Sequence, residues 1–314
     1  MTRDWLQSAL EAAGIQSARL LPLWRFMWIV SIVVFVLVVA AALWAVARHR
    51  RDAAPPPSER GMTRAILGAT ALTIATLFAF LVLDFSTGRA ITRVPHNPLV
   101  IRLTGHQWWW EVEYDDSIPQ RHLRTANEIH VPVGRPVLFQ LESGDVIHSF
   151  WVPSLAGKKD QIPGKENSVW FQADTAGIYR GQCAEFCGYQ HAKMALLVIA
   201  VPPDSFSKWY DSQLQPAAPP ADSIAARGQS VFVSSACVMC HTIEGTQAGS
   251  NVGPPLTHIA SRRTIAAGTL ENTRGNLAGW IVDPQRIKPG ANMPPNGLSS
   301  ADLNALLTYL EGLR

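Results

Sequence analysis

Two long apolar runs near the N-terminus constrain the fold of this chain more than any other feature. They cover residues 24–47 and 65–85. Each run exceeds the roughly 20 residues that a helix needs to span the hydrocarbon core of a bilayer. Trp24, Trp28 and Trp44 lie toward the ends of the first run, where aromatic anchors at a membrane interface are expected. The sequence therefore predicts a transmembrane hairpin in contact with membrane lipid.

A secretory signal peptide is the alternative interpretation of the first run. The apolar stretch is longer than the roughly 7–15 residues of a signal-peptide core, which favours a retained helix. About twenty residues also precede the run, which points the same way. Cleavage elsewhere near the N-terminus stays open.

Basic residues cluster between the two runs, at Arg48, Arg50, Arg51 and later Arg64. By the positive-inside rule, the 48–64 loop is expected in the cytoplasm. The N-terminus and the long C-terminal part are then expected on the outer side, the periplasmic side of a bacterial inner (plasma) membrane. The net charge of +3 is small and is explained by this topology, so we expect no nucleic-acid partner.

The residue pattern divides the chain into four parts. Residues 1–95 would hold an N-terminal segment and the hairpin, with a helix at each apolar run. Short runs rich in valine, isoleucine and aromatic residues, separated by turn residues, predict an all-β domain over residues 96–212. Residues 213–223 form a linker rich in proline and alanine. Residues 224–314 are predicted to be mainly helical.

Four soft metal ligands lie close together at Cys183, Cys187, His191 and Met194, separated by three, three and two residues. Thiolate, imidazole and thioether groups select copper over calcium or magnesium. A disulfide between the two cysteines, a zinc site and a methionine that merely fills the core are the alternatives. His148, in the stretch Asp145-Val-Ile-His148-Ser, supplies a second imidazole and favours copper. A β-sandwich of the cupredoxin type would bring this distant histidine beside the loop.

A second metal signal is Cys237-Val-Met-Cys240-His241, the pattern of covalent haem attachment. A redox dithiol or half of a zinc site are alternative interpretations. Met293 lies in a proline-bounded loop before the final helix, where a thioether could serve as the sixth iron ligand. The order of helix, haem motif, Gly253-Pro-Pro-Leu, methionine loop and helix resembles class I cytochrome c. His241 and Met293 are the expected axial ligands.

Several motifs together resemble cytochrome c oxidase subunit II, and the appended haem region resembles its cytochrome-c-fused, caa-type form. The motifs are Gly105-His-Gln-Trp108-Trp-Trp-Glu111, Asp145-Val-Ile-His148-Ser, Val152-Pro-Ser-Leu155, Ile162-Pro-Gly164 and Gly181-Gln-Cys183-Ala-Glu-Phe-Cys187-Gly. The expected fold class is a multi-domain membrane protein with a two-helix hairpin, a cupredoxin-like β-sandwich and an all-α class I cytochrome c domain.

The resemblance implies a dinuclear CuA centre with six ligands. Cys183 and Cys187 would bridge both coppers, and His148 and His191 would cap one each. Met194 and the backbone carbonyl of Glu185 would be weak ligands, in the set His148, Cys183, Glu185, Cys187, His191 and Met194. The resemblance further implies that the Glu185 side chain helps to bind magnesium at the boundary with subunit I.

Trp108 is expected by resemblance at the point where electrons from a donor reach CuA, although alternation along a strand would also explain it as sheet core. A glutamate before the second membrane helix can lie at a proton channel in related oxidases. Glu59 is the nearest residue of this kind, but its surroundings match poorly, and an ordinary loop glutamate is the simpler interpretation.

The expected function is electron transfer within a terminal respiratory oxidase with coupled proton translocation. Electrons would pass from cytochrome c or another donor through haem c and CuA to a haem of subunit I, with subunit III as a further partner. The chain lacks the histidine-rich helices of an oxygen-reducing site. The equivalent subunit of a CuA-containing nitric oxide reductase and a stand-alone membrane-anchored carrier are the alternatives. A quinol oxidase subunit would not need the copper ligands.

Overall fold

The computed structural model describes residues 6–49 and 58–314 of the chain. Arg50 and Arg51 of the basic cluster, and the first five residues, lie outside the described residues, and the cytoplasmic position of the 48–64 loop stays a prediction. Each compact unit is described by itself: the helical hairpin of residues 18–93, and a second unit that contains everything after residue 94 together with the N-terminal segment.

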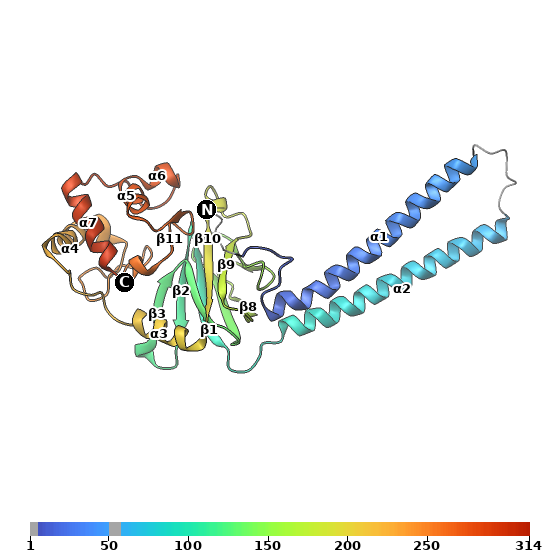
Figure 1. Ribbon diagram of the computed structural model, residues 1–314, viewed down its shortest axis with the longest axis horizontal. Helices are drawn as coiled ribbons and strands as arrows, with labels where there is room; N and C mark the ends of the chain where they lie inside the picture. The colour runs from blue at the N-terminus through green and yellow to red at the C-terminus, as the bar shows by residue number, and fades with distance from the viewer. Residues whose placement is uncertain (1–5, 50–57) are drawn as a thin grey trace. The chain divides into compact units, whose positions relative to one another are not determined.

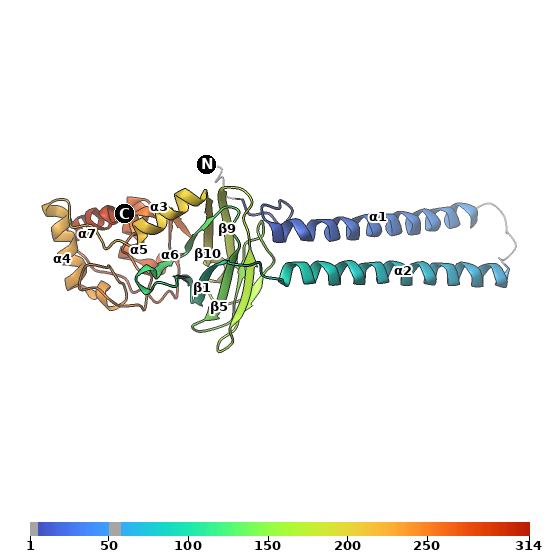
Figure 2. The ribbon, with the colours of Figure 1, turned by 90° about the horizontal axis from the view of Figure 1, so that it is seen from below.

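The hairpin consists of helices α1 (Ile15–His49) and α2 (Glu59–Thr92). Both are long and apolar enough to cross a membrane, which agrees with the prediction of two spanning helices. They run side by side in opposite directions, with the rings of Phe26 and Phe80 4.7 Å apart (Figures 1 and 2). Ser58 caps α2 by accepting a hydrogen bond from the Gly61 N–H, which places Glu59 in the first turn of this helix.

Two five-stranded sheets form the β-sandwich, residues 99–201 (Figure 1). One sheet has the order β3-β2-β1-β5-β8 and the other β4-β10-β9-β6-β7. The strands are β1 (Leu99–His106), β2 (Trp109–Asp115), β3 (Leu123–Ala126), β4 (Glu128–Pro132), β5 (Val137–Ser143), β6 (His148–Trp151), β7 (Lys159–Gln161), β8 (Asn167–Phe171), β9 (Gly177–Cys183) and β10 (Ala195–Val201). Short 3-10 turns lie at η1 (Pro119–Arg121) and η2 (His191–Lys193).

Alternation of buried and partly exposed residues along β1, β2 and β5 builds the core between the sheets. Successive side chains of a strand point to opposite faces, so every second residue enters the core. Ile101, Leu103 and Phe139 are fully buried there, and the Phe139 ring lies 4.8 Å from that of Phe171. This rigid core supports the ends of β6, β9 and β10.

The N-terminal segment, residues 6–17, adds to the β-sandwich through its backbone. The Leu6 N–H donates to the carbonyl of Ile178 at 3.0 Å, and the Ala13 N–H donates to that of Ser154 at 2.8 Å. The buried Gln16 side chain donates to the Trp170 carbonyl at 2.9 Å. Residues 6–17, which include the first residues of α1, therefore belong to the folded unit that contains the sandwich.

After helix α3 (Pro203–Gln213), the chain enters the C-terminal helical region, residues 223–314. Its elements are α4 (Ser223–Ser234), η3 (Ala236–Met239), η4 (Ile259–Ser261), β11 (Thr264–Ile265), β12 (Leu270–Glu271), α5 (Arg274–Val282), α6 (Pro284–Ile287) and α7 (Ser300–Gly312). Helices α4 and α7 cross closely at Gly228, where a Cβ atom would lie 2.0 Å from the Ala305 carbonyl oxygen. Ser299 caps α7 by accepting a hydrogen bond from the Asp302 N–H at 3.1 Å.

Candidate metal centres

The β-sandwich places the predicted copper ligands at the ends of three neighbouring strands. Cys183 is the last residue of β9, and Met194 immediately precedes β10. The loop between these two strands carries Cys187 and His191. His148 opens β6, which pairs with β9 so that Phe150 lies opposite Cys183. The strand pairing thus brings a histidine from 35 residues upstream to the loop.

The donor atoms converge within hydrogen-bonding or contact distance. The two sulfurs of Cys183 and Cys187 lie 3.7 Å apart. His148 Nδ1 lies 3.8 Å from the Cys183 sulfur, and His191 Nδ1 lies 3.5 Å from the Cys187 sulfur. The Met194 sulfur is 3.8 Å from that of Cys187, and the Glu185 carbonyl oxygen is 3.2 Å from that of Cys183. The other four predicted donors therefore each contact one sulfur of the cysteine pair, His148 and the Glu185 carbonyl that of Cys183, and His191 and Met194 that of Cys187.

This donor set fits a copper centre better than the alternatives. The sulfur separation is far longer than the roughly 2.05 Å of a disulfide, and all four cysteines are free. His148 is fully buried, and Cys183, Cys187 and Met194 are at most 3% exposed. Zinc sites rarely include a thioether, whereas soft sulfur and imidazole ligands suit copper.

Hydrogen bonds around the cluster orient His148 and favour a thiolate at Cys183. His148 Nε2 donates to the Asp145 carboxylate at 2.8 Å, which leaves Nδ1 facing the cysteines. Burial raises the pKa of Asp145, but hydrogen bonds from His148 and from the backbone of Val146 outweigh it, so the pKa lies below its usual value. The hydrogen bond from Cys187 lowers the pKa of Cys183, which favours the thiolate that a metal requires.

The outer side of the same loop presents a different chemistry. Phe186 and Tyr189 are 76% and 82% exposed. The Glu185 carboxylate points away from the sulfur cluster and pairs with the Lys158 ammonium at 3.3 Å. Among the described residues, the one group of three or more acidic, histidine and cysteine side chains with metal-binding geometry is His148, Cys183 and Cys187, so the predicted magnesium at Glu185 is unsupported.

Trp108 lies directly beside the copper loop, the segment between β9 and β10 that carries Cys187 and His191. Its indole N–H donates to the Cys187 carbonyl at 2.8 Å, and the neighbouring Gln107 side chain donates to the same oxygen at 2.8 Å. The tryptophan is partly buried against the core cluster. One backbone carbonyl thus links the indole to the residue that carries a predicted sulfur ligand, and the role of Trp108 in electron entry stays a prediction.

The haem motif begins in η3, between α4 and an irregular segment of the C-terminal helical region. His241 Nδ1 lies 2.7 Å from the Pro254 carbonyl oxygen. A carbonyl only accepts, so Nδ1 carries the proton and Nε2 keeps a lone pair for iron. Burial lowers the pKa of His241, which further favours the neutral ring. The absence of a side chain at Gly253 leaves room for this ring, since a Cβ there would lie 2.9 Å from His241 Cε1.

Met293 lies in the predicted loop between α6 and α7. Its backbone carbonyl accepts a hydrogen bond from Gln285 Nε2 at 2.9 Å, and the same nitrogen donates to the Ala291 carbonyl at 2.7 Å. Gln285 therefore holds the loop at Ala291 and at the backbone of Met293 itself. The free Cys237 and Cys240, the oriented His241 and the braced Met293 fit the attachment and ligation of a c-type haem.

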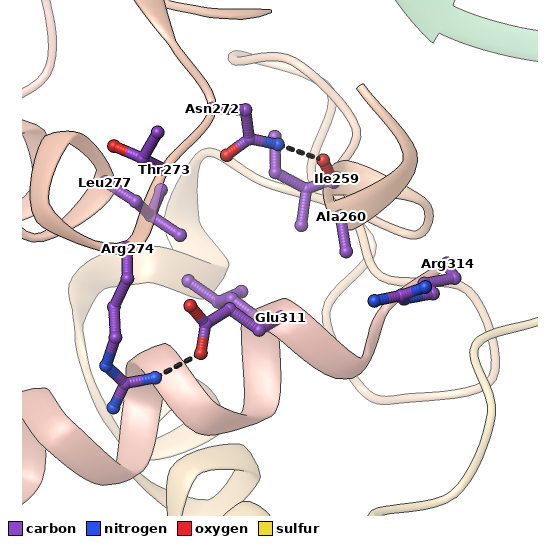
Figure 3. A pocket seen from close by; sticks show the side chains of 9 residues that line it. Ile259, Ala260, Asn272, Thr273, Arg274, Leu277, Glu311 and Arg314 are labelled. Atoms are coloured by element: carbon purple, nitrogen blue, oxygen red, sulfur yellow. Dashed lines mark hydrogen bonds and ion pairs between the residues drawn. The ribbon is translucent and has the colours of Figure 1, made fainter. Parts of the chain in front are cut away.

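A separate surface pocket lies in the C-terminal helical region between α5, α7 and η4 (Figure 3). Arg274 pairs there with Glu311, and Asn272 donates to the Ile259 carbonyl at 2.8 Å. None of the predicted ligands lines this pocket, so it belongs to neither metal centre.

Three functional candidates were not predicted from the sequence. Asp145 orients His148, and its position three residues before that histidine was a usable signal. Glu128 is the one acidic residue of a strand that also contains His130, which is a weaker signal. Lys288 has no local pattern that distinguishes it from a surface lysine. Glu128 and Lys288 are each only 3% exposed.

Comparisons with known proteins agree with this geometry. Residues 99–201 match the family "Cytochrome C oxidase subunit II, periplasmic domain", and residues 225–314 match the family "Cytochrome c". The chain is 36% identical to cytochrome c oxidase subunit 2 of Alkalihalophilus pseudofirmus over 92% of its own length and 84% of that relative. It is 32% identical to the Bacillus subtilis subunit over 71% of its length and 64% of the relative.

One solved structure among those similar to the chain is the periplasmic domain of subunit II of the Bradyrhizobium japonicum cytochrome oxidase. It is 33% identical and covers 38% of this chain and 96% of that chain, with a TM-score of 0.37.

Proposed function

The chain belongs to the cytochrome c oxidase subunit 2 family, and from that premise we propose how its residues carry electrons through the oxidase. The chain is a membrane-bound subunit of an oxidoreductase complex and associates with other oxidase subunits. We propose that His148, Cys183, Cys187, His191, Met194 and the Glu185 carbonyl hold CuA, that Cys237 and Cys240 attach haem c, and that His241 and Met293 ligate its iron.

The gathering of two thiols, two imidazoles, a thioether and a backbone carbonyl around the Cys183–Cys187 sulfur pair carries this proposal. When bound, haem c and CuA would each accept and release one electron, taking it from a donor and passing it to a haem of subunit I. The chain's own residues hold these groups in place. Strand pairing sets the positions of the ligand atoms before metal binds, and Asp145 sets the tautomer of His148. The ligand side chains therefore need little rearrangement on binding.

The finer assignments rest on the resemblance. Cytochrome c is the proposed donor, with subunits I and III as membrane partners in a bacterial inner membrane. The metal-binding regions would face the periplasm. Coupled proton translocation would take place in the partner subunits, and Glu59 would be a helix N-terminal residue without a channel role. A magnesium ion at Glu185 would need ligands from subunit I and would have to displace Lys158.

The oxidase assignment stands above the two alternatives, since the relatives are oxidase subunits and not nitric oxide reductase subunits or free carriers. The test of the metal assignment is metal analysis and near-infrared absorption of the purified full-length chain. We expect two coppers, one iron and the absorption band of a mixed-valence copper pair. One copper, or zinc in its place, would refute the CuA assignment.

Replacing His148 with alanine gives the sharper form of this test. The variant loses a copper ligand but leaves the haem motif intact, so copper should fall while covalent haem stays at the wild-type amount. His122→Ala is the matched control, because His122 lies at the surface beside Glu113 and Asp115, away from the cluster. Equal copper in the His148 variant and the wild type would contradict the assignment.

A further inference from the structure

The C-terminal helical region contacts the β-sandwich through two buried charged side chains, one from each side. Glu128, in β4 of the sandwich, accepts three hydrogen bonds at its Oε1 atom. They come from the backbone N–H of Arg263 at 2.8 Å, and from the backbone N–H and hydroxyl of Thr264 at 2.8 and 3.0 Å. A carboxylate that accepts three hydrogen bonds from a neighbouring region holds that region in one specific position.

Lys288 makes the reciprocal contact from the C-terminal helical region. Its ammonium donates to the carbonyl of Trp108 at 2.7 Å and to that of Ala266 at 3.2 Å. Because Lys288 is 3% exposed, its charge would be costly without these partners. The contact therefore ties the chain at Trp108, the residue beside the copper loop, to the segment that leads to Met293.

The residues next to Lys288 complete this contact. The Pro289 carbonyl accepts from the Gln190 side chain at 2.7 Å, and the Ile287 carbonyl accepts from the Lys193 ammonium. Gln190 and Lys193 both belong to the copper loop. Gly290 passes over the indole of Trp108, since a Cβ there would lie 3.6 Å from the ring. Residues 287–290, here the bridging segment, thus cover Trp108 and end three residues before Met293.

From these contacts we infer that Glu128 and Lys288 are positioning residues. They hold the C-terminal helical region, here also called the haem-bearing region, over Trp108. The inference rests on the proposed function, because it assumes haem c on one side and CuA on the other. In this arrangement the C-terminal helical region is held at one position on the β-sandwich and is not merely tethered to it by the linker. The covered Trp108 is then reached by the chain's own haem, and a soluble donor meets haem c first.

The buried position of both charges explains why the dock should be specific. Removing the Glu128 carboxylate leaves the buried Thr264 N–H and the partly buried Arg263 N–H without this acceptor, which weakens docking by about tenfold or more. Removing the Lys288 ammonium leaves the Trp108 carbonyl unpaired in the same interface. The losses belong to separate hydrogen-bond sets, so the double variant should weaken docking by about a hundredfold.

The test uses the full-length protein in the assembled oxidase and compares Glu128→Ala/Lys288→Met with wild type. Rapid mixing with a reductant gives the rate at which electrons leave haem c for CuA, read from the absorption of each centre. Hydrogen–deuterium exchange of the peptide containing Arg263 and Thr264 reports docking without reference to activity. We expect transfer to slow by about tenfold or more and exchange of this peptide to accelerate by a similar factor.

Two further variants separate positioning from folding. Glu128→Gln keeps the Oε1 acceptor. In this variant the rate of electron transfer from haem c to CuA and the protection of the Arg263–Thr264 peptide should both match the wild type. Arg227→Met removes a long cation from the same region at a surface pair with Asp302 and should change neither. The haem and copper spectra should be those of the wild type in every variant.

The inference is overturned if the double variant transfers electrons at the wild-type rate, or if its Arg263–Thr264 peptide stays protected. A different result would refute the proposed function itself: wild-type protein that carries both centres and passes no electron between them. The two failures are therefore distinguishable in one set of measurements.

Discussion

At the scale of single residues, two of the proposed metal-binding histidines, His148 and His241, are oriented by hydrogen bonds. In each ring the bond is made by the nitrogen that would face away from the metal. Asp145 accepts from His148 Nε2, and the Pro254 carbonyl accepts from His241 Nδ1. Each bond selects one tautomer and one ring orientation, so the metal-facing nitrogen needs no proton transfer before it binds. Electron transfer benefits, because ligands that are already held in place rearrange little when charge changes.

Met293 gives the prediction that belongs to this scale. A thioether ligand raises the reduction potential of a haem, so Met293→Ala should lower the potential of haem c and leave the sixth position open to added ligands. Potentiometric titration and the visible spectrum measure both effects. Met239→Ala is the matched control, because Met239 lies inside the haem motif with its side chain 71% exposed. An unchanged spectrum in the Met293 variant would reject the ligand assignment.

At the scale of elements, the C-terminal helical region depends on the close crossing of α4 and α7 at Gly228. Gly228→Val would drive a side chain into the Ala305 carbonyl, which has little freedom because it belongs to the helix backbone. We expect a loss of more than about 3 kcal/mol, beyond the usual cost of an overpacked core, and therefore failure of this region to mature with haem. Covalent haem per polypeptide, measured after denaturing electrophoresis, checks the result.

Gly275→Ala is the control for the Gly228 substitution. Gly275 lies in α5 with no atom near its missing Cβ, so alanine there should leave haem content at the wild-type level and stabilise the helix by up to about 1 kcal/mol. Normal haem content in Gly228→Val would show that the two helices can separate without loss of the fold.

The elements that sequence predicts are those with their own local pattern. The apolar runs predict α1 and α2, and alternation predicts β1, β2 and β5. Strand β3, Leu123–Ala126, is not predicted because it has no valine, isoleucine or aromatic residue, and β7, Lys159–Gln161, is not predicted because it has no apolar alternation. The N-terminal segment joins the sandwich through backbone hydrogen bonds, which no side-chain pattern encodes.

The same reasoning separates the predicted metal ligands from the residues that were missed. The spacing of Cys183, Cys187, His191 and Met194 is a local signal, as is the motif around His241. Contacts across the chain have no such signal. Glu128 meets Thr264 across 136 positions and Lys288 meets Trp108 across 180, so only the fold reveals that these charges are buried and paired.

At the scale of the whole molecule, the order of the centres determines where electrons stop when one centre is lost. The bridging segment covers Trp108, and the haem-bearing region offers its own surface to a donor. Removal of copper should therefore leave electron transfer from the donor to haem c intact and abolish electron transfer from haem c to CuA. We expect the copper-depleted oxidase to lose nearly all oxygen consumption while haem c remains reduced during steady donor supply.

Cys187→Ser in the assembled oxidase tests this order. Cys187 supplies the sulfur nearest both His191 and Met194, and its carbonyl accepts from Trp108, so the substitution removes a proposed bridging ligand while leaving the backbone acceptor in place. Oxygen uptake and the haem c spectrum are followed together, with wild-type oxidase that has been depleted of copper and reloaded as the control for recovery. Sustained oxygen uptake without copper would mean that electrons bypass this centre, since a serial relay cannot conduct once its middle member is missing.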